Sequence, residues 1–136
     1  MIIKIDSSTT LNDINESFNR YYPYLKMKFY AHPHQNQEAS DENDIITDNP
    51  SVYEISKTHF VGNLKFHYWQ KTGIVEREIR NKVGLNVQIF RQKGNDWIQT
   101  VGTDEFTLEE QNEIGKISTE DMQHGTNRIF EREKKL

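Results

Sequence analysis

Two histidines and a group of acidic residues lie close together between residues 31 and 50. His32 and His34 flank Pro33, and in an extended segment their side chains would point to the same side. The acidic neighbours are Glu38, Asp41, Glu42 and Asp44. A divalent metal site needs three or four ligands that are held rigidly and supported by further hydrogen bonds. Because this segment has no helical or strand periodicity to hold ligands, we interpret it as a mobile, solvated loop that binds no metal.

Catalytic patterns are missing from the sequence. The chain has no cysteine, and no serine stands in a GxSxG elbow. The glutamates between residues 105 and 113 are typical of the solvated face of a helix, and paired catalytic carboxylates would need an apolar pocket to separate their pKa values. The glycines are too dispersed to surround a phosphate. The sequence therefore predicts a protein that is not an enzyme and holds no cofactor.

Lysines and aromatic residues recur on one side of several predicted strands. If helices cover one face of the resulting sheet, these residues gather on the other face. The predicted binding surface consists of Lys26, Lys28, Tyr30, Lys65, His67, Trp69, Gln88 and Phe90. Proteins that bind single-stranded nucleic acid use such faces, because aromatic rings stack on bases and lysines contact phosphates. Exposed aromatic patches serve equally for a protein partner or for self-association.

The charge of the chain ranks these functions. The formal net charge is -4, whereas nucleic-acid-binding domains usually carry a basic surface, and the RNP1-like consensus is absent. We therefore expect a non-enzymatic interaction domain that uses the open sheet face for an unknown protein partner or for homo-oligomer formation. Single-stranded nucleic-acid binding is the alternative, and a small-molecule enzyme comes third.

Length and composition predict one soluble domain. The chain has 136 residues, which suffices for one core, and 34% of them are hydrophobic. Its start lacks a positive region followed by a long apolar region, and no apolar run approaches the ~20 residues that span a bilayer. With no cysteine for a disulfide framework, we expect a cytoplasmic protein without membrane contact.

Alternation of apolar and polar residues predicts the strands. Leu25, Met27 and Phe29 alternate with polar neighbours, and residues 85–90 repeat the pattern. Further strands are expected at residues 2–5, 63–69 and 97–101. Gly94 provides the turn of a hairpin between the strand at residues 85–90 and the strand at residues 97–101.

Capping residues predict the helices. Thr10 and Asp13 form a capping-box pattern before the first helix, and Pro23 ends that helix. Thr72 is expected to cap the second helix, which carries the stripe of Val75, Ile79 and Val83, and Gly84 is the left-handed residue that ends it.

The third helix is predicted to begin at Asp104 or Thr107, of which Thr107 forms a capping box with Glu110, and to end at Gly115. We expect Asp104, Thr107 and Gln111 to bond to backbone groups nearby and hold the angle between hairpin and helix, rather than contact a ligand.

The order of these elements predicts an α+β fold. Strand, helix, strand, strand, helix, strand matches the ferredoxin-like βαββαβ core, with helices on one face of an antiparallel sheet of four to five strands. The first, third and fourth strands would lie at the centre, and the hairpin would add a strand beside the fourth. An open sheet with the hairpin as a separate flap is the competing arrangement.

We expect the domain to cover residues 1–116, followed by a charged C-terminal tail over residues 117–136. The predicted core consists of Phe18, Phe29, Phe66, Ile79, Val87, Ile89 and Leu108.

One segment resembles a known family. Residues 84–112 follow the pattern GLxVQxFRxxGxxWxxTxxTDxxTLxxQN, which is similar to the C-terminal half of a family of small, uncharacterised bacterial α+β proteins. The chain departs from the family pattern at Phe106, where the family has a tryptophan. The resemblance covers about half of the chain, implies the same domain type, and brings no known activity with it.

Overall fold

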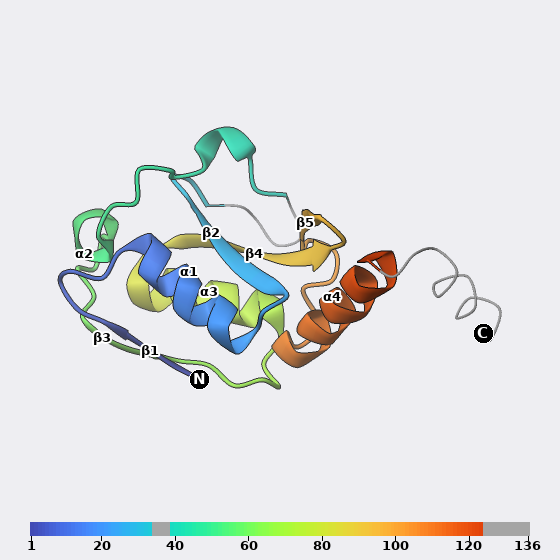
Figure 1. Ribbon diagram of the computed structural model, residues 1–136. Helices are drawn as coiled ribbons and strands as arrows, with labels where there is room; N and C mark the ends of the chain where they lie inside the picture. The colour runs from blue at the N-terminus through green and yellow to red at the C-terminus, as the bar shows by residue number, and fades with distance from the viewer. Residues whose placement is uncertain (34–38, 124–136) are drawn as a thin grey trace.

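The computed structural model of the protein describes residues 1–33 and 39–123 (Figure 1). In chain order, the elements of this part are β1 (Ile2–Ile5), α1 (Leu11–Tyr21), β2 (Leu25–Tyr30), the 3-10 helix η1 (Glu42–Asp44), α2 (Val52–Ile55), β3 (Gly62–Lys65), α3 (Thr72–Val83), β4 (Asn86–Lys93), β5 (Asp96–Gln99) and α4 (Leu108–Gln123). The predicted α+β class is confirmed. None of the helices in the described ranges is long and apolar enough to cross a bilayer.

Strands β2, β4 and β5 form an antiparallel sheet in that order. Met27 of β2 lies opposite Ile89 of β4, so the apolar residues of both strands share one face. Helices α1 and α3 pack against these strands (Figure 1). Leu25 and Arg91 are paired on the same face, and the Arg91 guanidinium donates to Gln111 of α4 at 2.8 Å. The helices therefore cover one face, as the sequence predicts.

The remaining strands correct the predicted sheet order. Among the described strands, β1 and β3 pair only with each other, as a second, two-stranded antiparallel sheet, and β2 rather than β1 lies next to β4. The single sheet of the expected ferredoxin-like core is therefore not formed. Alternation of apolar residues determines which face of a strand is buried, but it does not select the neighbouring strand.

Helix α1 begins at the predicted capping box. The Asp13 N–H donates to Thr10 Oγ1 at 3.2 Å, and the Thr10 N–H donates to Asp13 Oδ2 at 3.0 Å. The stripe of Leu11, Ile14 and Phe18 is buried. These residues bury one face of the helix against the core, which is where most helical stability in proteins comes from.

Helix α1 also occupies the open edge of β2. The Met27 N–H donates to Asn15 Oδ1 at 2.7 Å, and Asn19 Nδ2 donates to the Leu25 carbonyl at 2.8 Å. Further along, the Ile46 N–H donates to the Phe29 carbonyl at 2.8 Å. Side chains of a helix and the backbone of one loop therefore bond to edge groups of β2 that would otherwise be free to pair with another strand.

The predicted core is confirmed. All of its members are at most 4% exposed: Phe18, Phe29, Phe66, Ile79, Val87, Ile89 and Leu108.

The other face of the three-stranded sheet is partly covered by residues 39–46. The Ser40 N–H donates to Gln99 Oε1 at 2.9 Å, and Gln99 Nε2 donates back to the Ser40 carbonyl at 3.0 Å. The Ser40 hydroxyl also contacts Gln88 Oε1 at 3.3 Å. This half of the predicted loop is thus docked on the sheet, while residues 34–38 lie outside the described residues.

Helix α4 runs through Gly115 to Gln123, so the prediction that the helix ends at Gly115 is wrong. The first seven residues of the predicted tail belong to this helix, and residues 124–136 lie outside the described part of the chain. Gly115 has a packing role instead. A Cβ at this position would lie 2.9 Å from Tyr24 Cβ and 3.1 Å from Arg91 Cγ. The glycine therefore permits close approach of α4 to the sheet.

Replacing Gly115 with alanine is expected to destabilise the protein. In an exposed helix the change would stabilise by about 1 kcal/mol, but the 2.9 Å contact with Tyr24 Cβ forces α4 or β2 to shift, which typically costs about 1–3 kcal/mol. We expect a net loss of about 1 kcal/mol in urea unfolding, because the steric cost exceeds the gain in helix propensity. An unfolding midpoint at or above that of the parent protein would contradict the close packing.

Candidate functional site

The structure divides the predicted binding surface. Tyr30, Gln88 and Phe90 are buried, at 2%, 0% and 6% exposure. Lys26 and Lys28 lie beside them but are half-buried, with their ammonium groups 4.4 Å and 4.6 Å from the ring centroids of Trp97 and Phe90. The prediction that this face of the sheet is open is therefore wrong for Tyr30, Gln88 and Phe90. Residues 39–46 cover part of it, and the lysines lie over its rings.

Lys65, His67 and Trp69 belong to a different surface. Lys65 is the last residue of β3 in the two-stranded sheet, and His67 and Trp69 lie in the loop that follows this strand. The rings of His67 and Trp69 are stacked, with centroids 5.0 Å apart and planes inclined by 7°. We call residues His67–Trp69 the aromatic loop. Tyr68 and Trp69 are each 59% exposed.

Hydrogen bonds fix the backbone of the aromatic loop. The His67 N–H donates to Gln70 Oε1 at 2.8 Å, and the Gln70 N–H donates to the His67 carbonyl at 3.0 Å. The Tyr68 carbonyl accepts from the N–H of Glu109, and the Gln70 carbonyl accepts from that of Leu108, both in the first turn of α4. The loop thus satisfies N–H groups at the start of a helix, and its exposed rings stand on an ordered backbone.

The structure describes part of the histidine-rich loop. His32 Nδ1 lies 3.2 Å from Asp44 Oδ1, and both residues are at least partly exposed. Within the described ranges, no group of three or more histidine, aspartate or glutamate side chains is arranged to hold a metal ion. His34 and Glu38 lie outside those ranges.

The segment before α4 contains the expected capping box. The Glu110 N–H donates to Thr107 Oγ1, and the Thr107 N–H donates to Glu110 Oε1, both at 3.1 Å. Gln111 Nε2 donates to the Thr103 carbonyl at 2.7 Å and to its hydroxyl at 2.9 Å. These bonds tie α4 to the turn that follows β5, and Gln111 is fully buried.

Glu76 is the most unusual ionisable group among the described residues. It is 6% exposed, and its Oε2 accepts from the Ile89 N–H at 2.8 Å. Strand β5 pairs with β4 only up to Gln99, opposite Phe90. The Glu76 carboxyl therefore bonds to the edge of β4 just beyond the end of the neighbouring strand.

Burial controls the charge of Glu76. Desolvation raises the pKa of Glu76 to about 8. The Ile89 hydrogen bond lowers this pKa, the nearby Asp104 raises it, and Arg80 lowers it. At neutral pH the carboxyl is therefore mostly protonated, because the cost of burying its charge exceeds the two favourable contributions.

The helical position of Glu76 could have revealed its burial. Arg80 stands four residues further along the helix, a spacing at which Glu76 could also form an ion pair. In the structure the buried stripe of α3 consists of Thr72, Val75, Glu76, Ile79 and Val83. Position 76 is three residues from Ile79 and seven from Val83, so it falls on the same face as these apolar residues.

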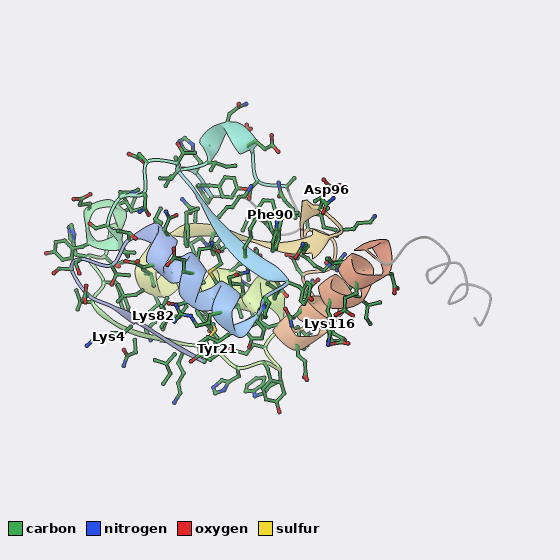
Figure 2. All side chains as sticks on the ribbon, viewed as in Figure 1. Lys4, Tyr21, Lys82, Phe90, Asp96 and Lys116 are labelled. Carbon is green, nitrogen blue, oxygen red and sulfur yellow. The ribbon has the colours of Figure 1, made fainter. Side chains whose placement is uncertain are left out.

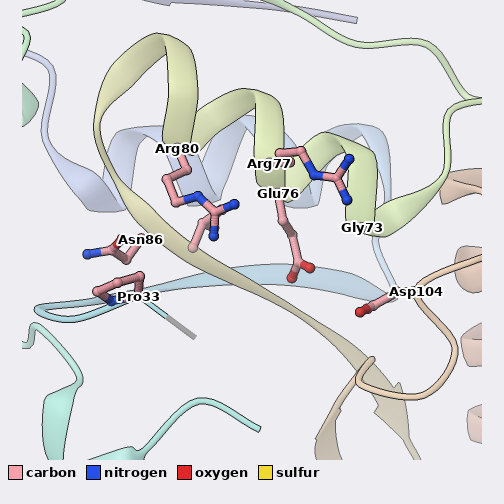
Figure 3. A pocket seen from close by; sticks show the side chains of 8 residues that line it. Pro33, Gly73, Glu76, Arg77, Arg80, Asn86 and Asp104 are labelled. Atoms are coloured by element: carbon pink, nitrogen blue, oxygen red, sulfur yellow. The ribbon is translucent and has the colours of Figure 1, made fainter. Parts of the chain in front are cut away.

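A small pocket lies beside the Glu76 carboxyl (Figure 3). Its lining residues are Pro33, Gly73, Glu76, Arg77, Arg80, Asn86, Val87 and Asp104. The Asp104 carbonyl accepts from the Gly73 N–H at 3.0 Å, and its side chain faces the pocket from the turn before α4. The volume is about 20 Å3, enough for roughly one water molecule. A substrate does not fit, so the perturbed carboxyl does not by itself make a catalytic site.

Comparison with family models, with curated proteins and with solved structures finds no match for the chain. The resemblance of residues 84–112 to small bacterial α+β proteins therefore stays a prediction.

Proposed function

We propose that the protein is a non-enzymatic interaction domain that binds a partner protein through the aromatic loop and the outer face of the β1–β3 sheet. The observation that carries this proposal is the exposure of Tyr68 and Trp69 on a hydrogen-bonded backbone. Tyrosine and tryptophan are the residues most enriched among those that dominate the binding energy of interfaces. An ordered loop also loses little conformational entropy on binding.

The charge beside the aromatic loop selects the partner. On the outer face of the two-stranded sheet, exposed Ile2 is paired with Lys65 and exposed Lys4 with Asn63. Apolar and aromatic groups are thus flanked by lysines, and a partner with carboxylates around an apolar pocket complements them. A two-fold contact between copies would place these lysines opposite one another, which favours a different, acidic protein over self-association.

Single-stranded nucleic acid fits this surface less well. Stacking requires a free aromatic face, and His67 already covers one face of the Trp69 ring.

The test uses a photo-crosslinking amino acid in place of Tyr68, expressed in the native host. We expect it to trap one acidic protein, which a crosslinker at Tyr53 does not trap. With that partner purified, Trp69→Ala should weaken binding by about 30-fold or more, since truncation of a dominant interface residue costs about 2 kcal/mol or more. Tyr53→Ala is the matched control, because Tyr53 is also exposed and its ring packs on that of a histidine, His59. Both residues precede β3 in the chain, whereas the aromatic loop follows it.

Three outcomes would contradict the proposal. Equal crosslinking at positions 68 and 53 would show that the aromatic loop is not an interface. A dimer in sedimentation velocity that Trp69→Ala dissociates would assign the surface to self-association. Binding of labelled single-stranded RNA that weakens with salt and is lost in Lys65→Gln would assign it to nucleic acid.

A further inference from the structure

A second concave region lies away from the aromatic loop, where β2 ends and β4 begins. Its lining residues are Phe29, Tyr30, Ala31, His32, Pro33, Ile46, Ile55, Lys57, Arg80, Gly84, Leu85 and Asn86. The volume of this cleft is about 610 Å3, thirty times that of the pocket beside Glu76. Small-molecule sites typically have volumes of roughly 300–1,000 Å3. The cleft therefore has the size of a ligand site, which the pocket does not.

The floor of the cleft is apolar. Phe29 and Leu85 belong to the buried core, and Ile46 and Ile55 pack against that core while remaining partly exposed. Partly exposed aliphatic side chains in a concave site favour an apolar ligand, because the ligand removes their surface from water.

The rim of the cleft is cationic. Lys57 and Arg80 both line it, and none of its described lining residues is an aspartate or glutamate. The ion pairs found within the described residues join His32 to Asp44 and Lys71 to Glu105, so neither rim cation is taken up by a carboxylate there. On the same helix, Arg80 acts electrostatically on Glu76, and burial keeps that carboxyl mostly protonated at neutral pH. The charge of Arg80 is therefore available to an anion.

The turn that carries Lys57 is fixed on the end of α3. The Ser56 hydroxyl donates to the Val83 carbonyl, and the Thr58 hydroxyl donates to the same carbonyl at 3.0 Å. Gly84 has a φ of 78°, and a Cβ there would lie 3.3 Å from the backbone nitrogen of Lys57. These bonds hold the turn in place and also occupy a helix C-terminal carbonyl that would otherwise repel an anion.

We propose that this cleft binds a small amphipathic anion, a carboxylate on an apolar chain, with the carboxylate between Arg80 and Lys57 and the chain over Ile46 and Ile55. Arg80 is suited to a carboxylate because its guanidinium offers two parallel donors. In Figure 3 the Arg80 side chain extends from α3 towards β4, and its guanidinium lies between Asn86 and Glu76. This site is independent of the aromatic loop, so either proposal can fail without the other.

Octanoate is the probe, titrated into the full-length protein with binding followed by calorimetry and by amide shifts in NMR spectra. We expect saturable binding with shifts concentrated at residues 29–33, 55–57 and 84–86. Octanol and octylamine are the matched neutral and cationic probes, and both should bind at least tenfold more weakly, because neither has a carboxylate to accept charge-assisted hydrogen bonds from Arg80 and Lys57. Octanol binding as tightly as octanoate would overturn the recognition of an anion.

Variants separate the charge from the apolar floor. Arg80→Gln and Lys57→Gln should each weaken octanoate binding about tenfold or more, and Lys82→Gln should leave it unchanged. Lys82 is the control, because it is an exposed cation on the same helix that does not line the cleft. Ile55→Asn should weaken octanoate and octanol alike. The proposal is overturned if octanoate does not bind at millimolar concentration, or if Lys82→Gln weakens binding as much as Arg80→Gln.

Discussion

Glu76→Gln is expected to stabilise the protein at alkaline pH by about 3–5 kcal/mol, the free-energy equivalent of a carboxyl whose pKa rises from 4.5 in the unfolded chain to about 8 in the folded one. Between these values the folded state holds a proton that the unfolded state has released. Stability from this group is therefore complete below pH 4.5, falls as the pH rises to 8, and is constant above it. Glutamine is neutral at every pH, and its amide oxygen can still accept from the Ile89 N–H.

The measurement is the free energy of unfolding in urea between pH 5 and pH 9. The parent protein should lose stability across this range, and Glu76→Gln should lose much less. Glu78→Gln is the matched control, because Glu78 lies two residues away on the same helix but is exposed. If Glu76→Gln retains the pH slope of the parent protein, the buried carboxyl is not the group that titrates.

Phe18→Ala should cost about 3–5 kcal/mol of stability, the usual loss when a buried aromatic ring is removed from a core. Phe18 is fully buried, and its ring lies 5.4 Å from that of Tyr22, so the truncation leaves a cavity and removes an aromatic pair. Urea unfolding at neutral pH measures the loss.

Tyr21→Ala controls for the general effect of removing an aromatic residue from α1. Tyr21 is 55% exposed, and its truncation should change the free energy of unfolding by less than about 1 kcal/mol. Equal losses for the two variants would mean that α1 does not pack on the sheet through the stripe that contains Phe18.

Features that depend on neighbouring residues could be predicted from the sequence. The capping boxes at Thr10 and Thr107, the left-handed Gly84 and the turn at Gly94 each need only a few adjacent residues to form. Their hydrogen bonds close within four positions of the chain, so the residue types specify the geometry directly.

Features that depend on distant segments could not be predicted. Nothing in the alternation of β2 shows that it pairs with β4, because each strand with an apolar face is compatible with several neighbours. The burial of Gln88 and Phe90 has the same origin. Their strand pattern places them on the polar face, and Ser40, nearly fifty residues earlier, contacts Gln88 and covers part of that face.

The two candidate sites could be predicted from the sequence to different degrees. Lys65, His67 and Trp69 are in the predicted surface and lie together in the structure, since they belong to one short stretch of chain. Lys57 and Arg80 come from separate elements that meet only when the turn after α2 docks on α3. A site whose residues are brought together only by such tertiary packing cannot be recognised from a motif in the sequence.

Two asparagines of α1, Asn15 and Asn19, also bear on how copies of the protein behave at high concentration. Polymerisation through sheets needs a row of free backbone donors and acceptors at an edge. Asn15 and Asn19 occupy such groups on β2 with their side-chain amides, and Ile46 adds a backbone bond. Fibril growth from this end of the larger sheet would first have to detach a helix whose stripe is buried in the core. The asparagines thus protect the folded chain against templated aggregation, at the edge formed by the most apolar strand of the larger sheet.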